Sequence, residues 1–391
     1  MEKEFVFHRV IKSDLDFCNM QKNRNRLTKG VVQARGGRFV IYGRRDTGKT
    51  SIVKSLVIPH FRKHHLSAGK ESLVIFCDLM SVSDRTSVSQ RMRRSLEQGL
   101  GNSFPSRLLE IAKSLATLRP TLGLGDDGKP ELSLGTSTTN APDIVDLLDA
   151  IARIGSNKPT LVVLDEFQDL HRVAEMEALF RDAFQNFPDH ISVVVLGSKK
   201  HLLSKIFARP DAPLAGWGEA VNIEPIPFAE YHAYIEERLN RHGLTMPAEV
   251  CTQLQDKLQR VPEDINIICQ QLLETLCAAQ EKKEEPNVEP RVVTSIDIAN
   301  VTNEHLDASA SLYEELLRPL TSRQVKFLTA LAKAGRVAEP YSSSFLAQAD
   351  LPLGTVQKIL LSLEDEAIIY RDKEGYSVGK PLLALYLRKY R

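Results

Sequence analysis

Short, nearly continuous apolar runs alternate with longer stretches of helical periodicity over the first 225 residues of the chain. Runs that are apolar along their whole length are typical of strands buried on both faces of a parallel sheet. Amphipathic stretches between such strands are typical of crossover helices. The predicted strands are 38–42, 73–77, 160–164, 191–196 and, more weakly, 220–223. The pattern therefore predicts an α/β fold with a parallel sheet and flanking helices.

One interruption separates the second predicted strand from the third. Residues 119–135 contain alternating segments on either side of Asp127 and Gly128, and an Asp-Gly pair in this setting is typical of a β-hairpin turn. We interpret about 119–140 as a hairpin inserted at the edge or on the surface of the sheet.

The β pattern stops after the Pro-Ile-Pro sequence at 225–227. Amphipathic helices follow, and their predicted ranges are 228–242, 247–259, 262–280 and 295–304. They indicate a small helical lid over 228–307, after a core over 1–227.

A third pattern begins near residue 308. Its predicted helices are 308–318, 322–334, 344–349 and 354–366. Two short strands, 368–371 and 376–378, follow around a turn that contains Gly375. Helices followed by a Gly-turned hairpin are typical of a winged helix, a helix-turn-helix variant, which we assign to 308–391.

The first predicted strand leads directly into a complete G-x-x-x-x-G-K-[ST] motif and then a helix. In this motif the glycines let backbone N–H groups face a polyphosphate, and the helix N-terminus favours its charge. Lys49 would reach the β- and γ-phosphates of ATP, and Thr50 would be a ligand of Mg²⁺. A Gly-rich turn with a solvated lysine is the plainer alternative. The predicted nucleotide-binding residues are Gly43, Arg44, Arg45, Asp46, Thr47, Gly48, Lys49, Thr50 and Ser51.

The third predicted strand ends in two carboxylates, Asp165 and Glu166, at the edge where open α/β sheets bind ligands. Asp165 is placed to hold Mg²⁺, and Glu166 to polarise a water that attacks the γ-phosphate. A helix N-cap is the alternative use of the pair. Because the chain has a Glu here and no Asn-Lys-x-Asp sequence for reading guanine, we predict an ATPase and not a Ras-like GTPase.

Polar residues also follow the fourth predicted strand. Ser198 is a candidate to contact the γ-phosphate or the attacking water, and helix capping is the alternative. Lys199 and Lys200 would meet phosphate or a neighbouring subunit, or else be ordinary surface lysines at the start of a helix.

Together these residues resemble the archaeal-type ATPases of the AAA+ and STAND group, which occur in bacteria as well as archaea. The resemblance covers nearly the whole chain and includes the segments 42–51, 77–79, 164–170, 196–198, 213–216 and 320–324. It implies a P-loop NTPase of the AAA+/ASCE type with a helical lid and a C-terminal winged helix. It also implies that Lys49 and Thr50 bind nucleotide and Mg²⁺. Asp165 and Glu166 would serve metal and water, with Ser198 as the polar sensor.

The chain departs from that family in two places. Trp217 stands where the family usually has an arginine that could stabilise charge on the nucleotide, so hydrolysis would be slow or need an arginine from elsewhere. The second departure is that no basic residue follows Pro262 at the spacing of the family's lid sensor.

Arg209 lies where AAA+ proteins commonly present an arginine to the adjacent subunit's nucleotide, with a solvated arginine as the alternative.

Composition limits the range of partners. Lys and Arg total 51 and Asp and Glu total 50, so no global field draws the molecule to nucleic acid or to a membrane. No apolar run approaches the roughly 20 residues that span a bilayer, and the N-terminal residues lack the apolar stretch of a signal peptide. Five cysteines without a Cys-x-x-Cys pair predict reduced thiols, so we expect a cytoplasmic protein with no membrane contact.

The winged helix sets the choice between two hypotheses. Lys358, Arg371 and Lys373 would contact DNA phosphates, although acidic residues interleave with them. The first hypothesis is an ATP-dependent switch that forms homo-oligomers and contacts DNA. The alternative is a slow-turnover, STAND-type signalling or scaffold NTPase whose winged helix binds a protein partner or packs on the core.

Overall fold

The computed structural model describes residues 3–18, 20–101, 118–124, 130–136, 143–281 and 290–391. The chain forms two compact units. The sheet unit comprises 21–43 and 49–223, and the helical unit comprises 1–20, 44–48 and 224–391. The finer division at 227 and 307 stays a prediction. Among the described helices, none is long and apolar enough to cross a membrane.

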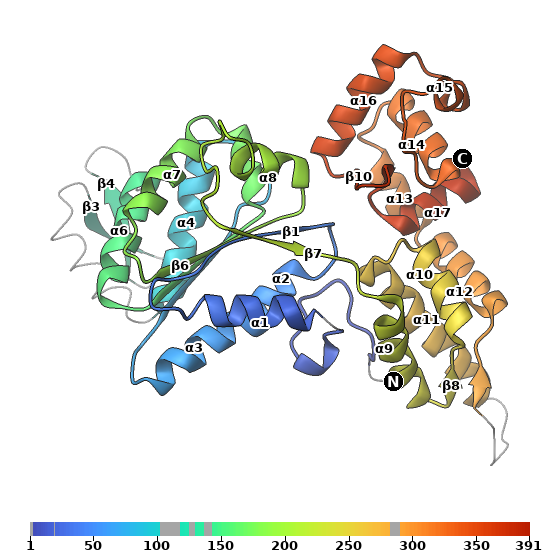
Figure 1. Ribbon diagram of the computed structural model, residues 1–391, viewed down its shortest axis with the longest axis horizontal. Helices are drawn as coiled ribbons and strands as arrows, with labels where there is room; N and C mark the ends of the chain where they lie inside the picture. Colours follow the sequence, from blue (N-terminus) through green and yellow to red (C-terminus); the bar gives the residue numbers. More distant parts are fainter. Residues whose placement is uncertain (1–2, 19, 102–117, 125–129, 137–142, 282–289) are drawn as a thin grey trace. The chain divides into compact units, whose positions relative to one another are not determined.

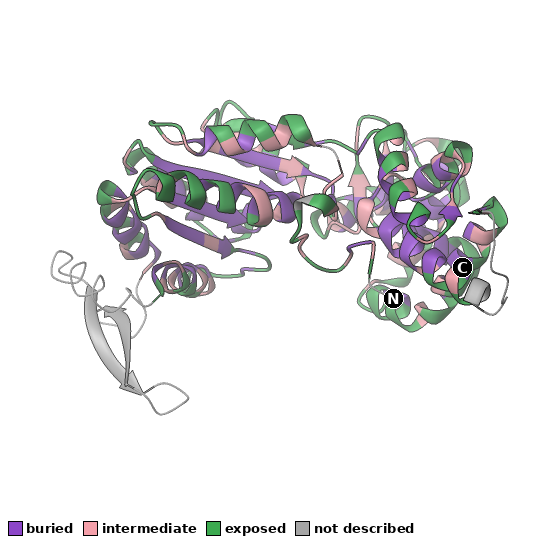
Figure 2. Cartoon of the chain, turned by 90° about the horizontal axis from the view of Figure 1, so that it is seen from below, coloured by how far each residue is buried: buried purple, intermediate pink, exposed green. Residues whose placement is uncertain are grey.

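Five parallel strands form the centre of the sheet unit (Figure 1). They are β1 (Arg38–Gly43), β2 (Leu73–Asp78), β5 (Thr160–Asp165), β6 (Ile191–Gly197) and β7 (Glu219–Ile223). Their order is β2-β5-β6-β1-β7, so β6 lies between the strand before the phosphate motif and the strand before the two carboxylates. All five predicted strands are confirmed. Strands β1, β2, β5 and β6 are mostly buried on both faces, as continuous apolar runs require (Figure 2), whereas in the edge strand β7 only Val221 and Ile223 are buried.

The register of these strands aligns their carboxyl ends. Asp78 pairs with Asp165 across β2 and β5, and Leu164 pairs with Val195 across β5 and β6. Tyr42 of β1 pairs with Gly197 of β6. The residues that end these strands therefore meet at one edge of the sheet.

Helices cover both faces of this sheet. They are α1 (Gln21–Gly30), α2 (Lys49–Ile52), α3 (Ile58–Ser67), α4 (Arg85–Leu100), α6 (Ile144–Asn157), α7 (Met176–Asn186) and α8 (Lys200–Phe207). One apolar cluster joins α4, α6 and α7 to β2, β5 and β6, and α1, α2 and α3 lie on the opposite face (Figure 1). A π-helical segment, Val53–Val57, links α2 to α3. Pro59 lacks the N–H that an α-helix would pair with the carbonyl of Ser55, which accounts for the wider turn.

The predicted hairpin is present as backbone pairing. Strands β3 (Leu118–Leu124) and β4 (Pro130–Thr136) form an antiparallel two-stranded sheet of their own. The Asp127–Gly128 pair that we expected to make the turn lies outside the described residues.

The helical unit begins with the predicted lid helices. They are α9 (Phe228–Asn240), α10 (Ala248–Lys257), α11 (Pro262–Glu281) and α12 (Ser295–Ala308). A short parallel pair, β8 (Leu244–Thr245) with β9 (Arg291–Val292), was not predicted. The five cysteines of the chain are free thiols, as the sequence predicts.

The predicted winged-helix elements follow, and one apolar cluster runs through them and the lid helices. The elements are α13 (Ala310–Leu317), α14 (Ser322–Ala334), α15 (Ser343–Ala349), α16 (Leu353–Asp365), β10 (Ile369–Arg371), β11 (Tyr376–Val378) and α17 (Pro381–Tyr390). Helix α17 was missed because its first seven residues, 381–387, are all buried and so lack a polar face. Gly375 turns the hairpin at φ +133°, where a Cβ would lie 2.4 Å from the Val337 carbonyl oxygen.

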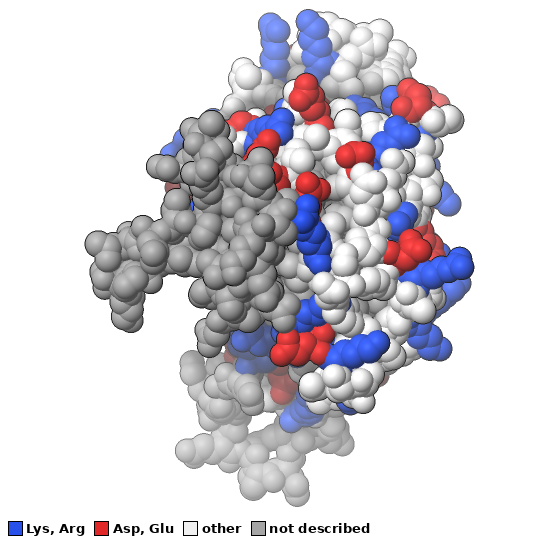
Figure 3. Space-filling model, turned by 90° about the vertical axis from the view of Figure 1, so that its left-hand side faces the viewer, with Lys and Arg blue, Asp and Glu red and all other residues white. Residues whose placement is uncertain are grey.

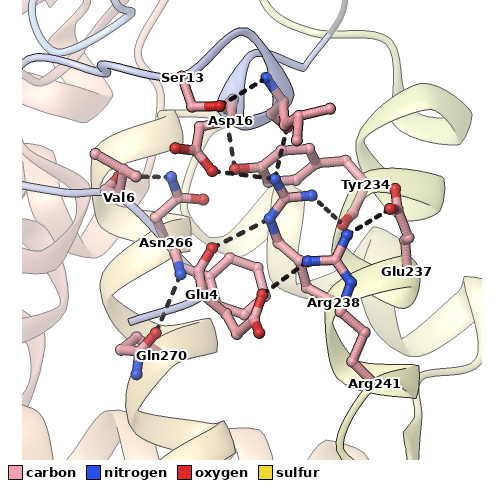
Figure 4. Close-up of polar contacts among 12 residues, drawn as sticks. Glu4, Val6, Ser13, Asp16, Tyr234, Glu237, Arg238, Arg241, Asn266 and Gln270 are labelled. Atoms are coloured by element: carbon pink, nitrogen blue, oxygen red, sulfur yellow. Dashed lines mark hydrogen bonds and ion pairs between the residues drawn. The ribbon is translucent and has the colours of Figure 1, made fainter. Parts of the chain in front are cut away.

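An N-terminal segment, residues 3–18, lies against α9 and α11 (Figure 4). Phe5 is fully buried in the apolar cluster of this unit. The buried guanidinium of Arg238 donates to the main-chain carbonyls of Glu4 (3.1 Å) and Leu15 (2.8 Å) and lies over the ring of Tyr234. A charge is stable inside this unit because polar groups surround it.

Candidate active site

Lys49 opens α2 directly after the phosphate loop. Its side chain is buried, and its Nζ donates to the carbonyl oxygen of Gly43 at the end of β1, 3.2 Å away. The lysine is thus held at the carboxyl edge of the sheet, where the motif predicts a phosphate-binding charge.

Thr50 and Asp165 are in direct contact at the same edge. The Thr50 hydroxyl donates to Oδ2 of Asp165 over 2.7 Å. Burial raises the pKa of Asp165, and the nearby charges of Glu166 and Asp78 act in the same direction, whereas the hydrogen bond from Thr50 lowers it. A hydroxyl and a partly desolvated carboxylate are oxygen donors of the kind that Mg²⁺ prefers. These two residues fit the predicted cation.

Glu166 directly follows β5 and has a left-handed conformation, with φ of +51°. Its Oε2 accepts two hydrogen bonds, one from the Ser198 hydroxyl at 3.0 Å and one from Nε2 of Gln168. Ser198 comes from the end of β6, as predicted, and it contacts the carboxylate of Glu166. A non-glycine residue in this conformation is uncommon, and active sites are one place where such residues gather.

A buried ion pair lies beside Glu166. Lys199 donates to Asp169 over 3.1 Å, and the other oxygen of Asp169 accepts the Ser81 N–H over 2.7 Å. The ammonium of Lys199 is therefore engaged within the sheet unit, while Lys200 lies over the ring of Tyr42. Our sequence analysis gave no role to Gln168 or Asp169. The sequence feature that could have indicated a role for them is the presence of two polar residues within the apolar stretch that follows Glu166.

Trp217 belongs to an aromatic cluster of the sheet unit. Its ring stacks on Phe184 with centroids 4.5 Å apart and lies 6.0 Å from Phe207. Phe167, the residue after Glu166, packs against Phe180 and Phe207 in the same cluster. The residue that stands in place of the family's arginine thus has a packing role.

Arg209 lies exposed in the turn after α8. Its main-chain N–H donates to the carbonyl of Ser204. Its role toward an adjacent subunit stays a prediction, since a single chain does not test it.

The loop residues 44–48 group with the helical unit. The Arg44 guanidinium is buried, and it donates to the main-chain carbonyls of Val378 (3.0 Å) and Gly379 (2.8 Å) and to the side chain of Gln259 (2.9 Å). Burial lowers the pKa of Arg44 to about 10. The guanidinium of Arg44 thus binds main-chain carbonyls at the hairpin of the winged helix. Phosphate binding by the main-chain N–H of Arg44 stays a prediction.

The other loop residues differ in exposure. Arg45 is exposed, and Thr47 is buried, with its hydroxyl donating to the Arg44 carbonyl over 2.7 Å. Asp46 and Gly48 have φ of +63° and +86°. Left-handed residues in a loop turn successive N–H groups toward one side, which is the arrangement that binds anions.

The winged helix presents a mixed surface. Lys358 lines a groove of about 780 Å³ between the first turns of α14 and α16, together with Arg323 and Thr355. Both acidic residues of the hairpin turn, Asp372 and Glu374, are paired with Arg336. On the sheet unit, the face seen in Figure 3 has Lys and Arg interspersed with Asp and Glu, as the near-zero net charge leads one to expect.

Comparison with known proteins identifies the fold. Residues 311–389 match a family model described as a probable winged helix domain. A Walker-type ATPase of Pyrococcus abyssi has a similar structure, with a TM-score of 0.62 and 15% identity over 97% of this chain and 99% of that one. The chain has the fold of a P-loop ATPase. The fold and the C-terminal winged helix implied by the resemblance are thereby confirmed.

Two proteins of Aeropyrum pernix also have structures similar to that of this chain. The ORC1 protein, in complex with DNA, has a TM-score of 0.53 and 13% identity, over 100% of this chain and 98% of that one. The ORC2 protein, in ADPNP–ADP complexes, has a TM-score of 0.50 and 15% identity, over 93% and 90%. No curated protein matches the chain in sequence.

Proposed function

We propose that the chain binds and hydrolyses ATP with Mg²⁺ and that its nucleotide state acts as a switch. The observation that supports this most directly is the meeting of Lys49, Thr50, Asp165 and Glu166 at one edge of the sheet, with Glu166 held by two donors. Solved structures with the same fold include an ADPNP–ADP complex.

Each residue has a separate task in this reaction. Lys49 places a positive charge on the phosphates, and Glu166 orients water and accepts its proton. The water oxygen bonds to the γ-phosphorus as the bond to the bridging oxygen breaks, giving ADP and phosphate. Thr50 and Asp165 would hold Mg²⁺, which when bound would neutralise charge on the phosphates. Trp217 adds no such charge, so turnover is slow unless another arginine, such as Arg209 of an adjacent copy, completes the site.

Steady-state ATPase assays test this function. We expect Lys49→Ala to remove nucleotide binding and Glu166→Gln to lower kcat by about 100-fold while binding persists. Lys54→Ala is the matched control, because this exposed lysine lies near Lys49 and covers the ring of Phe76. Equal hydrolysis by wild type and Glu166→Gln would contradict the assignment.

We also propose that the winged helix contacts DNA phosphates through Lys358, Arg371 and Lys373. Arg336 pairs with both acidic residues of the hairpin turn, and together with Arg371 and Lys373 it gives three positive charges against the two negative charges of Asp372 and Glu374. An ORC1 structure with the same fold is in complex with DNA. Neutralising the three basic residues should weaken duplex binding and lower the salt dependence of binding by about one unit of slope per lost contact. Lys326→Ala is the control, because it also removes a positive charge from the winged helix, but one that is paired with Asp350.

A protein partner is the second candidate for the winged helix. Leu353 and Leu361 on α16 are 44% and 67% exposed, and exposed apolar side chains that lie together are typical of protein-binding surfaces. If duplex DNA neither binds at low salt nor changes ATP turnover, this signalling or scaffold function is the better one. Sedimentation with ADP and with a non-hydrolysable ATP analogue then tests the proposed nucleotide-dependent homo-oligomer, with Arg209→Ala beside wild type.

A further inference from the structure

Gln168 is a fully buried glutamine in the 3₁₀ turn η4 (Phe167–Arg172), which follows β5 and Glu166 directly. Its Nε2 donates to Oε2 of Glu166. Its Oε1 is buried and accepts no hydrogen bond from any residue that the structure describes. An unpaired buried acceptor destabilises a fold, because it has lost its hydrogen bonds to water.

The orientation of the Gln168 amide is fixed by its neighbours. The reversed amide would place Oε1 against the carboxylate of Glu166, where two acceptors would repel each other. In the observed orientation Oε1 lies against Gly197, and a Cβ on that residue would be 2.1 Å from it. The absence of a side chain at 197 therefore makes room for this amide.

Packing alone does not account for a glutamine at this position. Leucine or methionine would fill a similar volume without an unpaired acceptor, and buried polar groups are destabilising unless they are satisfied. The only contact that needs an amide is the hydrogen bond to Glu166, among those the structure describes. The polar atom that Gln168 contributes is thus directed at the carboxylate of the site.

The two donors to Glu166 differ in mobility. The Ser198 hydroxyl is partly exposed and rotates about one bond, whereas the planar amide of Gln168 is enclosed on all sides. Both donate to the same oxygen, Oε2. This leaves Oε1 of Glu166 available to accept a hydrogen bond from water.

We propose that Gln168 is a positioning residue for ATP hydrolysis, which fixes the Glu166 carboxylate so that one oxygen is held and the other takes up the water. The inference rests on the proposed ATPase function. Gln168 touches neither substrate nor metal in this role, and acts only through Glu166. Its effect is therefore on kcat and not on nucleotide affinity.

The test measures kcat, KM and nucleotide affinity of the full chain. We expect Gln168→Leu to lower kcat by about 10-fold or more, with KM for ATP and the Kd of ADP within about twofold of wild type. Gln255→Leu is a matched control, since Gln255 is also fully buried with an unpaired Oε1 but lies in α10 and donates to the Phe228 carbonyl. It should leave kcat unchanged.

A double-mutant cycle separates positioning from packing. In a Glu166→Gln background, Gln168→Leu should have no further effect on the residual rate, because the group through which it acts is already lost. The chain has a single tryptophan, Trp217, in the aromatic cluster that includes Phe167. Its fluorescence reports whether the variant is folded around the site. Gln168→Met, which keeps the length of the side chain without the donor, repeats the test if the leucine variant does not fold.

The outcomes distinguish this inference from the function on which it rests. Active wild type with a normal kcat in Gln168→Leu or Gln168→Met overturns the positioning role alone. An equal loss of rate in the wild-type and Glu166→Gln backgrounds does the same. Wild type that binds ATP without hydrolysing it, beside an equally inactive Glu166→Gln, refutes the ATPase function and this role together.

Discussion

Thr50 donates its hydroxyl hydrogen to Asp165 across 2.7 Å, although the two residues are 115 positions apart in the chain. The start of α2 and the end of β5 are thus joined by their own side chains. The two oxygens that we expect to hold Mg²⁺ are already adjacent, so cation binding needs a rearrangement of this hydrogen bond and no movement of strands.

Asp165→Asn tests the cation site. The amide lacks the negative charge that attracts Mg²⁺, so we expect Mg²⁺ to cease to strengthen ATP binding in the variant. Titration of a fluorescent ATP analogue with and without Mg²⁺ measures this. Thr160→Val is the control at the opposite end of the same strand, where the hydroxyl of Thr160 bonds the Lys158 carbonyl. A full Mg²⁺ effect in Asp165→Asn would remove Asp165 from the site.

Gly197→Ala should lower the rate of hydrolysis by displacing the amide of Gln168 without a substitution of Gln168 itself. The added Cβ would lie 2.1 Å from Oε1 of Gln168 and 2.7 Å from a methyl carbon of Leu203, so the amide must move away from Glu166. We expect a fall in kcat of about 10-fold with little change in ADP affinity. Gly354→Ala, where a Cβ meets nothing within 4 Å, should leave kcat as it is. A normal kcat for both variants would show that the amide of Gln168 tolerates displacement.

Asp264 makes the stability of the helical unit depend on pH. Burial raises the pKa of Asp264 to about 6, with the charge of Asp46 acting in the same direction and the hydrogen bond from the Leu382 N–H opposing it. Because the folded chain holds this proton more tightly than the unfolded chain, stability is greatest below pH 4 for this group. It falls as pH rises through about 6, by about 3 kcal/mol in all.

Asp264→Asn should therefore raise the stability of this unit at pH 7–8 and flatten the pH dependence between 4 and 6. The asparagine keeps an oxygen for the Leu382 N–H and removes the buried charge. Thermal melts across this pH range provide the measurement. Asp350→Asn, at an exposed residue paired with Lys326, should leave the profile above pH 5 unchanged. A destabilised Asp264→Asn variant at pH 8 would mean that the charge of Asp264 is needed.

Arg238→Ala should detach the N-terminal segment from α9. The variant loses hydrogen bonds to two main-chain carbonyls of that segment, and it leaves those part-buried oxygens without this donor. We expect a loss of about 3 kcal/mol in the stability of the helical unit and faster proteolysis of residues 3–18. Arg241→Ala, at a half-exposed arginine that bonds the side chain of Glu4, should have a much smaller effect (Figure 4). Equal protease sensitivity of both variants would contradict this account.

Sequence patterns were sufficient for the sheet and for the edge at which the candidate site lies. Apolar runs end at Asp165 and at Gly197, and the carboxyl ends of parallel strands meet at one edge, so Lys49, Glu166 and Ser198 had to lie close together. The motif spacing predicts a phosphate-binding loop because few other arrangements of glycine and lysine fit it.

Long-range contacts were beyond the reach of these patterns. The amide of Gln168 fits beside Glu166 only because Gly197 has no side chain. No pattern near Gln168 or near Gly197 in the sequence predicts that the two residues are in contact. The commitment of Arg44 to the carbonyls of 378 and 379 depends on a hairpin more than 300 positions away. The pairing of Lys199 with Asp169 likewise joins two strand ends.

The order of strands in the sheet also determines when β1 can pair with its neighbouring strands during synthesis. β1 has β6 and β7 as its two neighbours, and these begin at residues 191 and 219. The first strand to leave the ribosome therefore waits for its partners while roughly 150 residues are added, which takes about 8–30 s at common elongation rates. Its apolar residues are unpaired throughout that interval, so the nascent chain is most exposed to aggregation and to chaperones before the sheet is closed.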